Sequence, residues 1–215
     1  MSTVVVFGGS GFAGKHIVDE LADRGHTVLA VARKPESLAE RSGVQAHAGS
    51  ALDADFAHRV SAGADVIIAA LPAVDDEGHT LDVPVSVLLE AARQSGARLG
   101  VVGGAGSLLV SEQGPRLADT PEFPAFLQPI VAAHGKALTV LGEAPDPVDW
   151  FYLSPAGAFG AQRPGERTGR YRTGGLVLLT TEDGDSFISG ADYAVAVADE
   201  IEKPVHHRER FTVGY

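Results

Sequence analysis

The residues with the clearest chemical meaning form a glycine-rich segment near the start of the chain, Gly8-Gly9-Ser10-Gly11-Phe12-Ala13-Gly14. The segment fits G-x-x-G-x-x-G through its first, fourth and seventh residues, and G-x-G-x-x-G through its second, fourth and seventh. Glycine permits a tight turn and a close approach of backbone to pyrophosphate, whose charge is attracted by the N–H groups that begin a helix. Because an apolar run precedes the segment and an amphipathic stretch follows it, we predict a dinucleotide-binding loop. The alternative is a glycine turn that only packs helix on strand.

The type of dinucleotide is indicated by the end of the second predicted strand, residues 27–32. An NAD site has Asp or Glu about 20 residues beyond the glycines, to bind the ribose 2′-hydroxyl. This strand ends instead on Val31-Ala32-Arg33-Lys34, without an acid. Arg33 can pair with the 2′-phosphate of NADP, with Lys34 as a second positive charge. The pattern favours NADP(H); the alternative is two solvated surface cations.

Further cofactor contacts are expected where the other parallel strands end, because their carboxyl ends lie at one edge of the sheet. The third strand, near residues 44–48, leads to the place where adenine is normally bound, and the fourth covers residues 66–71. The fifth and sixth strands, residues 99–102 and 149–153, lead to the nicotinamide. The candidates in chain order are Ser50, Ala51, Ala70, Leu71, Gly103 and Pro155. Asp53, just after the third strand, is equally consistent with a helix cap.

Ser107 is the candidate catalytic residue, because it follows the fifth strand and can donate a hydrogen bond to a substrate carbonyl or ring nitrogen. A turn serine bonded to its own backbone is the alternative. The chain contains no Tyr-x-x-x-Lys, the pair that moves the proton in alcohol oxidation by short-chain dehydrogenases. His134 and Lys136 lie in the corresponding helix, but residues two apart do not share a helical face. Routine alcohol oxidation is therefore not expected.

Several aromatic residues are candidates for stacking on a substrate or closing over it, and core packing is the alternative for each aromatic. The substrate candidates are Phe123, Phe126, His134, Phe159 and Tyr171. Trp150, in the middle of the sixth strand, is expected in the core. A loop over residues 157–175 carries Arg167, Arg170 and Arg172, which are expected either to meet a phosphate of the acceptor or to be solvated.

These residues are positioned by β-branched runs that alternate with longer amphipathic stretches, the pattern of βαβ units around a parallel sheet. We predict an α/β fold, a doubly wound and mostly parallel Rossmann sheet with a small C-terminal extension on the substrate side, in a single domain over residues 1–215. The first strand covers residues 3–7, and short strands are expected at residues 176–180 and 211–213. Helices are expected over residues 12–24, 81–95, 126–141 and 193–201, the last beginning at Ser189. Residues 108–124 are too long for a routine connection, which suggests a function.

Composition excludes several kinds of protein. The 215 residues include no cysteine, which excludes disulfides, thiolate metal sites and cysteine nucleophiles. A formal net charge of −11 without a basic run argues against a nucleic-acid partner. The eight histidines show no metal-ligand spacing, so no metal site is expected. No segment has the apolar length of a membrane span and the N-terminus lacks signal-peptide features, so we expect a cytoplasmic protein without a membrane partner.

The glycine pattern resembles that of the atypical short-chain dehydrogenases/reductases, and more specifically the chain resembles small bacterial proteins described as NAD(P)H–flavin reductases, relatives of biliverdin-IXβ reductase. The resemblance covers nearly the whole chain. It is carried by GGSGFAG from Gly8, VVGGAGSL from Val101, DTPEFP from Asp119, DWFYLSPAGAF from Asp149, PGERTGRYR from Pro164, DYAVAVADEIEKP from Asp192 and RFTVGY from Arg210.

This resemblance implies hydride delivery from NADPH to a flavin or a similar planar acceptor such as a quinone, the flavin being a substrate and not a resident cofactor. Such an acceptor spreads negative charge over its ring, which is compatible with the missing catalytic acid. The main alternative is a non-catalytic NADP(H)-binding redox sensor that regulates a partner. An epimerase or isomerase is less compatible, because the short C-terminal portion leaves little room for a nucleotide-sugar domain. The protein is expected as a monomer or homodimer.

Overall fold

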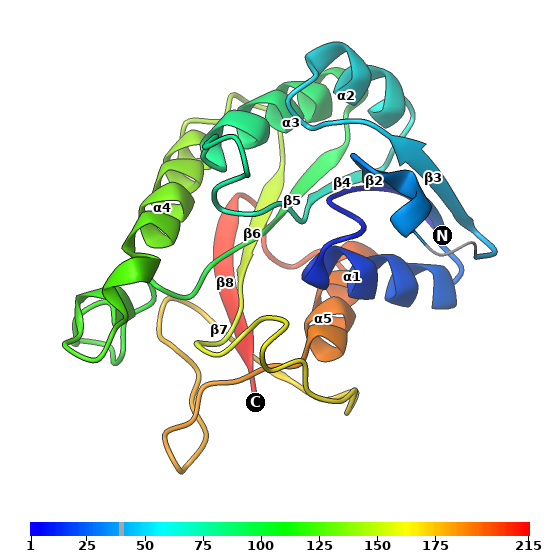
Figure 1. The fold of residues 1–215 in the computed structure, drawn as a ribbon. Coiled ribbons are helices and arrows are strands. Elements are labelled where there is room, and N and C mark those ends of the chain that lie inside the picture. Colours follow the sequence, from blue (N-terminus) through cyan, green and yellow to red (C-terminus); the bar gives the residue numbers. More distant parts are fainter. Residues whose placement is uncertain (39–40) are drawn as a thin grey trace.

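A computed structural model describes residues 1–38 and 41–215, and these residues form one eight-stranded sheet (Figure 1). The strand order is β3-β2-β1-β4-β5-β6-β8-β7, in which every neighbouring pair is parallel except β7 and β8. The order reverses direction between β1 and β4, as in a doubly wound sheet. The strands are β1 (Thr3–Phe7), β2 (Thr27–Ala32), β3 (Val44–Ala48), β4 (Val66–Ala69), β5 (Arg98–Val102), β6 (Trp150–Ser154), β7 (Arg172–Gly174) and β8 (Glu209–Gly214). The predicted Rossmann fold is confirmed.

Helices cover both faces of the sheet. The helices are α1 (Phe12–Asp23), α2 (Ala54–Ser61), α3 (Asp82–Ser95), α4 (Gln128–Gly142) and α5 (Gly190–Glu202). Figure 1 shows α1 and α5 side by side on one face and α2, α3 and α4 on the other. Successive strand residues point to opposite faces, so Val4 and Val6 pack in the core under α1 and α5, whereas Val5 and Phe7 pack under the other helices.

Local signals place several helix ends where the sequence predicts them. Gly25 and Gly96 follow helices α1 and α3 with φ of 82° and 74°, the left-handed conformation that stops a helix. Ser189 caps α5 by accepting a hydrogen bond from the Asp192 N–H at 3.0 Å. Asp53 accepts one from the Phe56 N–H at 3.0 Å, which confirms the cap reading of this residue and reveals α2, a helix that the sequence analysis did not identify.

The C-terminal part differs from expectation in one strand. The prediction of a strand at residues 176–180 is wrong. Strand β7 lies earlier in the chain, within the loop predicted at residues 157–175, and it pairs antiparallel with β8. Leu176 and Leu178 instead exchange backbone hydrogen bonds with Leu109, at 2.9 and 2.8 Å. Strand β7 has only three residues, which are too few to show an alternating apolar pattern in the sequence. Its position is set by its pairing with β8. Trp150 is buried in the core, as predicted.

Candidate cofactor and substrate site

The glycine segment after β1 forms a turn that has no space for side chains at two positions. The Gly8 and Gly9 N–H groups both donate to the Val31 carbonyl at 3.0 Å, which ties the turn to β2. Gly8 has φ +81°, and a Cβ there would lie 2.1 Å from the Ala70 carbonyl oxygen. A Cβ on Gly14 would lie 2.0 Å from the Gly8 carbonyl oxygen. These contacts require glycine and bring the start of α1 directly onto the turn.

The start of α1 has the properties of a phosphate site. Its N-cap is Gly11, which has no side chain with which to cap the first turn. The Gly11 N–H donates to Gly8, and the following N–H groups begin the helix. Uncapped N–H groups and the positive end of the helix dipole bind a pyrophosphate. Phe12 and Ala13 can take part only through their backbone, because the Phe12 ring packs 5.3 Å from that of Phe159 and Ala13 packs against the core.

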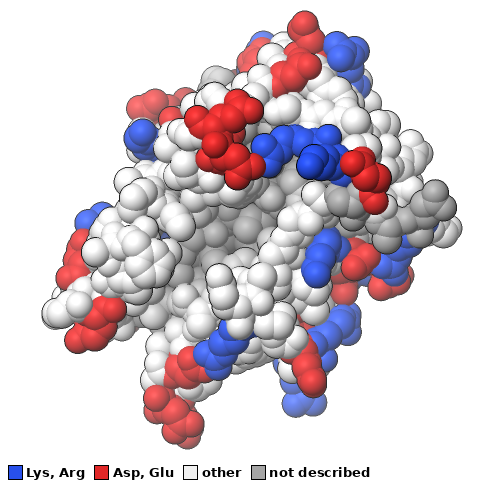
Figure 2. Space-filling model, in the orientation of Figure 1, with Lys and Arg blue, Asp and Glu red and all other residues white. Residues whose placement is uncertain are grey.

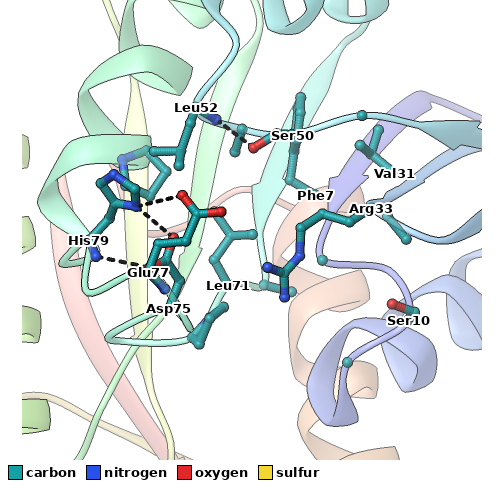
Figure 3. Close-up of a pocket in the computed structure, with 18 residues that line it drawn as sticks. Phe7, Ser10, Val31, Arg33, Ser50, Leu52, Leu71, Asp75, Glu77 and His79 are labelled. Atoms are coloured by element: carbon teal, nitrogen blue, oxygen red, sulfur yellow. Dashed lines mark hydrogen bonds and ion pairs between the residues drawn. The ribbon is translucent and has the colours of Figure 1, made fainter.

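A cavity of about 230 Å³ lies at the carboxyl ends of β1, β2 and β4, and we call it the adenosine cavity after the part of the dinucleotide that the sequence predicts there. Figure 3 shows side chains from these strands and from the segment between β4 and α3 around it. It brings together eight of the predicted cofactor residues. These are Gly8, Ser10, Gly11, Arg33, Ser50, Ala51 and Leu71, with Ala70 completing the wall. Lys34 is not among the described residues that line this cavity.

The other wall of the adenosine cavity is acidic, which the sequence analysis did not anticipate. Asp75, Glu77 and His79, from the segment between β4 and α3, line it opposite Arg33 (Figure 3). Asp75 accepts hydrogen bonds from the N–H groups of Glu77 and His79, at 2.9 and 2.8 Å, and lies 2.9 Å from the His79 ring nitrogen. Burial raises the pKa of Asp75, but these hydrogen bonds outweigh it and hold the pKa below its ordinary value. Residues 75–79 thus form a hydrogen-bonded turn beside Arg33, and we call this turn the flap.

A second cavity of about 280 Å³ lies at the ends of β5 and β6, and we call it the acceptor cavity after the hydride acceptor that the sequence predicts there. Six predicted residues meet there, namely Gly103, Ser107, Phe123, His134, Pro155 and Phe159. Leu117 and Phe123 come from the long irregular segment that was suspected of function. The other described lining residues are Gly104, Ala105, Gly106, Leu127, Ile130, Val131, Ala156 and Gly157. The face in Figure 2 shows a broad uncharged surface around the central hollow, with basic and acidic side chains adjoining at one rim.

His134 in the acceptor cavity is held in one tautomer by Tyr152. The Gly104 N–H donates to the Tyr152 hydroxyl at 3.0 Å, and the proton of that hydroxyl finds an acceptor when it is donated to His134 Nδ1, 2.9 Å away. Nδ1 is then an acceptor, and the proton of the neutral ring resides on Nε2. Burial, with the charge of Arg210 as the smaller cause, lowers the pKa of His134 to about 4. His134 is therefore a neutral hydrogen-bond donor through Nε2.

Tyr152 is a residue of the candidate site that the sequence analysis did not identify. It is fully buried on β6, and burial raises its pKa to about 12. A hydrophobic strand position such as this one gives no sign that its hydroxyl meets a histidine 18 residues earlier in the chain. Gly104 leaves the room for this contact, because a Cβ there would lie 2.7 Å from the His134 ring.

Two predicted substrate residues lie outside both cavities, which corrects the expectation for each. Phe126 is 78% exposed and lies in a short 3-10 helix, Ala125–Leu127, that precedes α4. Tyr171 packs towards α5, where its hydroxyl donates to Asp199. Of the arginines nearby, Arg167 pairs with Glu20 at 3.1 Å, and Arg172 donates to the Thr180 carbonyl at 2.6 Å. Neither arginine lines the acceptor cavity.

Two kinds of feature are absent from residues 1–38 and 41–215. These residues contain no group of three or more His, Asp or Glu side chains that could hold a metal ion. Within the same ranges, no helix has the length and apolar character needed to cross a membrane.

The fold and the glycine turn together define a dinucleotide-binding protein of the Rossmann class. The family model described as NAD(P)H-binding matches residues 8–204, and the chain belongs to this family. The residues fit the cofactor, because the turn has no room for side chains where a pyrophosphate must approach and the start of α1 is uncapped. The atypical short-chain dehydrogenase/reductase resemblance agrees with this assignment.

Three relatives cover nearly the whole chain. The uncharacterized protein YwnB of Bacillus subtilis (strain 168) is 39% identical over 217 residues, which cover 97% of this chain and 96% of that protein. A "putative epimerase" from Bacteroides thetaiotaomicron is 37% identical with a TM-score of 0.89, over 100% of this chain and 97% of that one. A "putative NADH-flavin reductase" from Streptococcus pneumoniae TIGR4 is 32% identical with a TM-score of 0.78, over 100% and 99% of the two chains.

Proposed function

We propose that this protein is an NADPH-dependent reductase that transfers hydride to a flavin, a quinone or a similar planar acceptor. The observation that carries the proposal is the pair of cavities along one edge of the sheet. The glycine turn and Arg33 line the adenosine cavity. Ser107 and His134 lie in the largely apolar wall of the acceptor cavity. A dinucleotide in a doubly wound sheet lies across the strand ends that separate two such cavities. Bound NADPH supplies the hydride.

The residues of the chain supply binding and orientation. The backbone of Gly8 to Gly11 and the start of α1 are placed to hold the pyrophosphate, and Arg33 the 2′-phosphate. Ser107 and His134 Nε2–H are placed to donate hydrogen bonds to an acceptor in the second cavity. Holding the acceptor ring in place accelerates the transfer by proximity, and no protein acid is required because solvent protonates the delocalised product.

The comparisons support the reductase class without deciding its substrate. One solved neighbour is named a "putative NADH-flavin reductase" and another a "putative epimerase", although both share the fold over nearly their whole length. A fold hosts different reactions, so the site must carry the argument. Here the absence of Tyr-x-x-x-Lys and the apolar acceptor cavity favour transfer to a planar ring over alcohol chemistry.

The deciding experiment follows the oxidation of NADPH with FMN, FAD, riboflavin and a simple quinone, each compared with NADH. Rapid turnover with NADPH, and much slower turnover with NADH, is the expected result. The matched variant Arg33→Gln should lose the preference for NADPH but keep turnover with NADH. Failure of every acceptor would overturn the proposal.

The second candidate function is a redox sensor that binds NADP(H) and regulates a partner protein. The missing catalytic pair and the net charge of −11 favour it, because an acidic surface can present a binding face to another protein. NADPH binding in the micromolar range or tighter, together with no turnover of any acceptor, would support the sensor over the reductase.

A further inference from the structure

The wall of the acceptor cavity has no permanent charge. None of the described residues that line it is Asp, Glu, Lys or Arg. His134 is its titratable group, and it is neutral at physiological pH because burial depresses its pKa. The largest apolar side chains that line it are Leu117, Phe123, Leu127, Ile130, Val131 and Phe159. A phosphate group placed against such a wall loses its hydration and gains no ion pair.

Two cations in the surrounding segments form ion pairs with neighbouring carboxylates. Arg116 pairs with both oxygens of Asp119, at 2.7 and 2.8 Å. Arg163 pairs with both oxygens of Asp185, at 2.9 and 2.6 Å. In each pair one guanidinium group binds both oxygens of one carboxylate, which is the two-point geometry with which arginine also binds a phosphate.

Two further cations lie near the cavity without lining it. Arg210 donates to Ser154 Oγ at 2.9 Å and sits 5.6 Å from the centre of the Tyr152 ring, behind the wall. Lys136 is exposed on α4 and, two residues from His134, lies on a different helical face. Neither cation is among the residues in contact with the cavity.

The polar groups of the acceptor cavity are suited to uncharged oxygen or nitrogen atoms. The His134 ring is fixed by Tyr152 with its Nε2 as donor, and Ser107 contributes a hydroxyl. A neutral carbonyl accepts a hydrogen bond from either group without a charge to compensate. Aromatic side chains in the same wall, Phe123 and Phe159, offer faces or edges to a planar ring.

We propose that the acceptor cavity takes an uncharged planar carbonyl compound of the quinone class, and that flavins carrying phosphate are poor substrates. This inference rests on the proposed reductase function and specifies its substrate. The reaction is balanced when the quinone gains a hydride from the dihydronicotinamide and one proton from solvent. The quinone is reduced by two electrons to a hydroquinone, and NADPH is oxidised to NADP⁺.

The test uses acceptors that share a ring and differ in charge. Riboflavin and FMN have the same isoalloxazine ring, and only FMN carries a phosphate. With saturating NADPH, kcat/KM for riboflavin is expected to exceed that for FMN at least tenfold, and menadione, a neutral quinone, should be at least as good as riboflavin. Equal or faster turnover of FMN would overturn the inference, as would turnover of flavins without turnover of the quinone.

A variant pair tests whether missing charge is the cause. Ile130 lines the cavity and is 41% exposed, so a longer polar side chain there can reach solvent. In Ile130→Arg the new guanidinium group should pair with the phosphate of FMN, so the ratio of kcat/KM for riboflavin to kcat/KM for FMN should fall at least threefold. The uncharged control Ile130→Gln should leave this ratio unchanged. An identical effect of both variants would overturn the electrostatic explanation.

The outcomes also separate this inference from the proposed function. If FMN is reduced as fast as riboflavin, the substrate class is wrong and the reductase function stands. If NADPH binds and no acceptor is reduced, the reductase function fails and the substrate class fails with it.

Discussion

Arg33 Nη2 lies 3.0 Å from Asp76 Oδ2, so the cation expected to hold the NADP phosphate is paired with a carboxylate of the flap between β4 and α3. The two residues are 43 positions apart in the chain. Both side chains are mostly exposed, at 64% and 85%, so the pair contributes at most about 1 kcal/mol. Asp75 and Glu77 line the adenosine cavity together with Arg33, so the positive charge of Arg33 lies among carboxylates there.

Asp76→Asn should strengthen NADPH binding. The 2′-phosphate must displace Asp76 from Arg33, and removing an exposed ion pair of up to about 1 kcal/mol corresponds to at most roughly fivefold in Kd. NADH lacks that phosphate, so its affinity should not change. Calorimetric titration of both cofactors is the measurement. In an Arg33→Gln background the substitution should have no effect, and an equal change for NADPH and NADH would contradict the competition.

Gly14→Ala should damage both stability and cofactor binding. The added Cβ would lie 2.0 Å from the Gly8 carbonyl oxygen, so α1 must move away from the turn. Overpacking of this kind costs about 1–3 kcal/mol, seen as a lower midpoint of urea unfolding. Gly135→Ala on α4 is the control, because no atom lies within 4 Å of its Cβ and alanine favours a helix by about 0.5–1 kcal/mol. Equal stability of the two variants would refute the packing argument.

Tyr152→Phe should affect the acceptor cavity more than the cofactor. It leaves the Gly104 N–H and His134 Nδ1 without their shared partner, which costs about 1–3 kcal/mol of unfolding free energy. The His134 ring is then no longer held with its proton on Nε2, so kcat/KM for the acceptor should fall about tenfold. The Kd for NADPH should stay within about twofold, since Tyr152 does not line the adenosine cavity. Nitrogen NMR shifts of His134 report the tautomer directly, and an unchanged tautomer would contradict this account.

His134 should make stability depend on pH. Its pKa is about 4 in the folded protein and 6.5 in the unfolded chain, so between these values the unfolded chain binds more protons. The stability that neutral His134 contributes is therefore present above pH 6.5 and is lost as pH falls towards 4. His134→Gln should flatten the change in unfolding free energy between pH 7.5 and 5. A wild-type His134 that titrates near pH 6.5 by proton NMR would disprove the shift.

Much of the fold was predictable because its signals are local. The glycine turn, the apolar strand runs and the caps at Gly25, Gly96 and Ser189 depend on which backbone conformations a short segment can adopt. Strand and helix alternation then restricts the topology to a doubly wound sheet. The positions of Gly8, Arg33, Ser50 and Ser107 at one sheet edge followed from that topology.

By itself the sequence determined the Rossmann sheet and the dinucleotide turn, because both arise from patterns within a few residues or from strand order. Only the tertiary structure decided that Asp76 meets Arg33, that Tyr152 orients His134, and that Tyr171 packs on α5 and not in the acceptor cavity. It also decided that β7 begins at Arg172. These contacts join side chains from separate elements, and no local preference specifies which surfaces pack together or leave a cavity without charge.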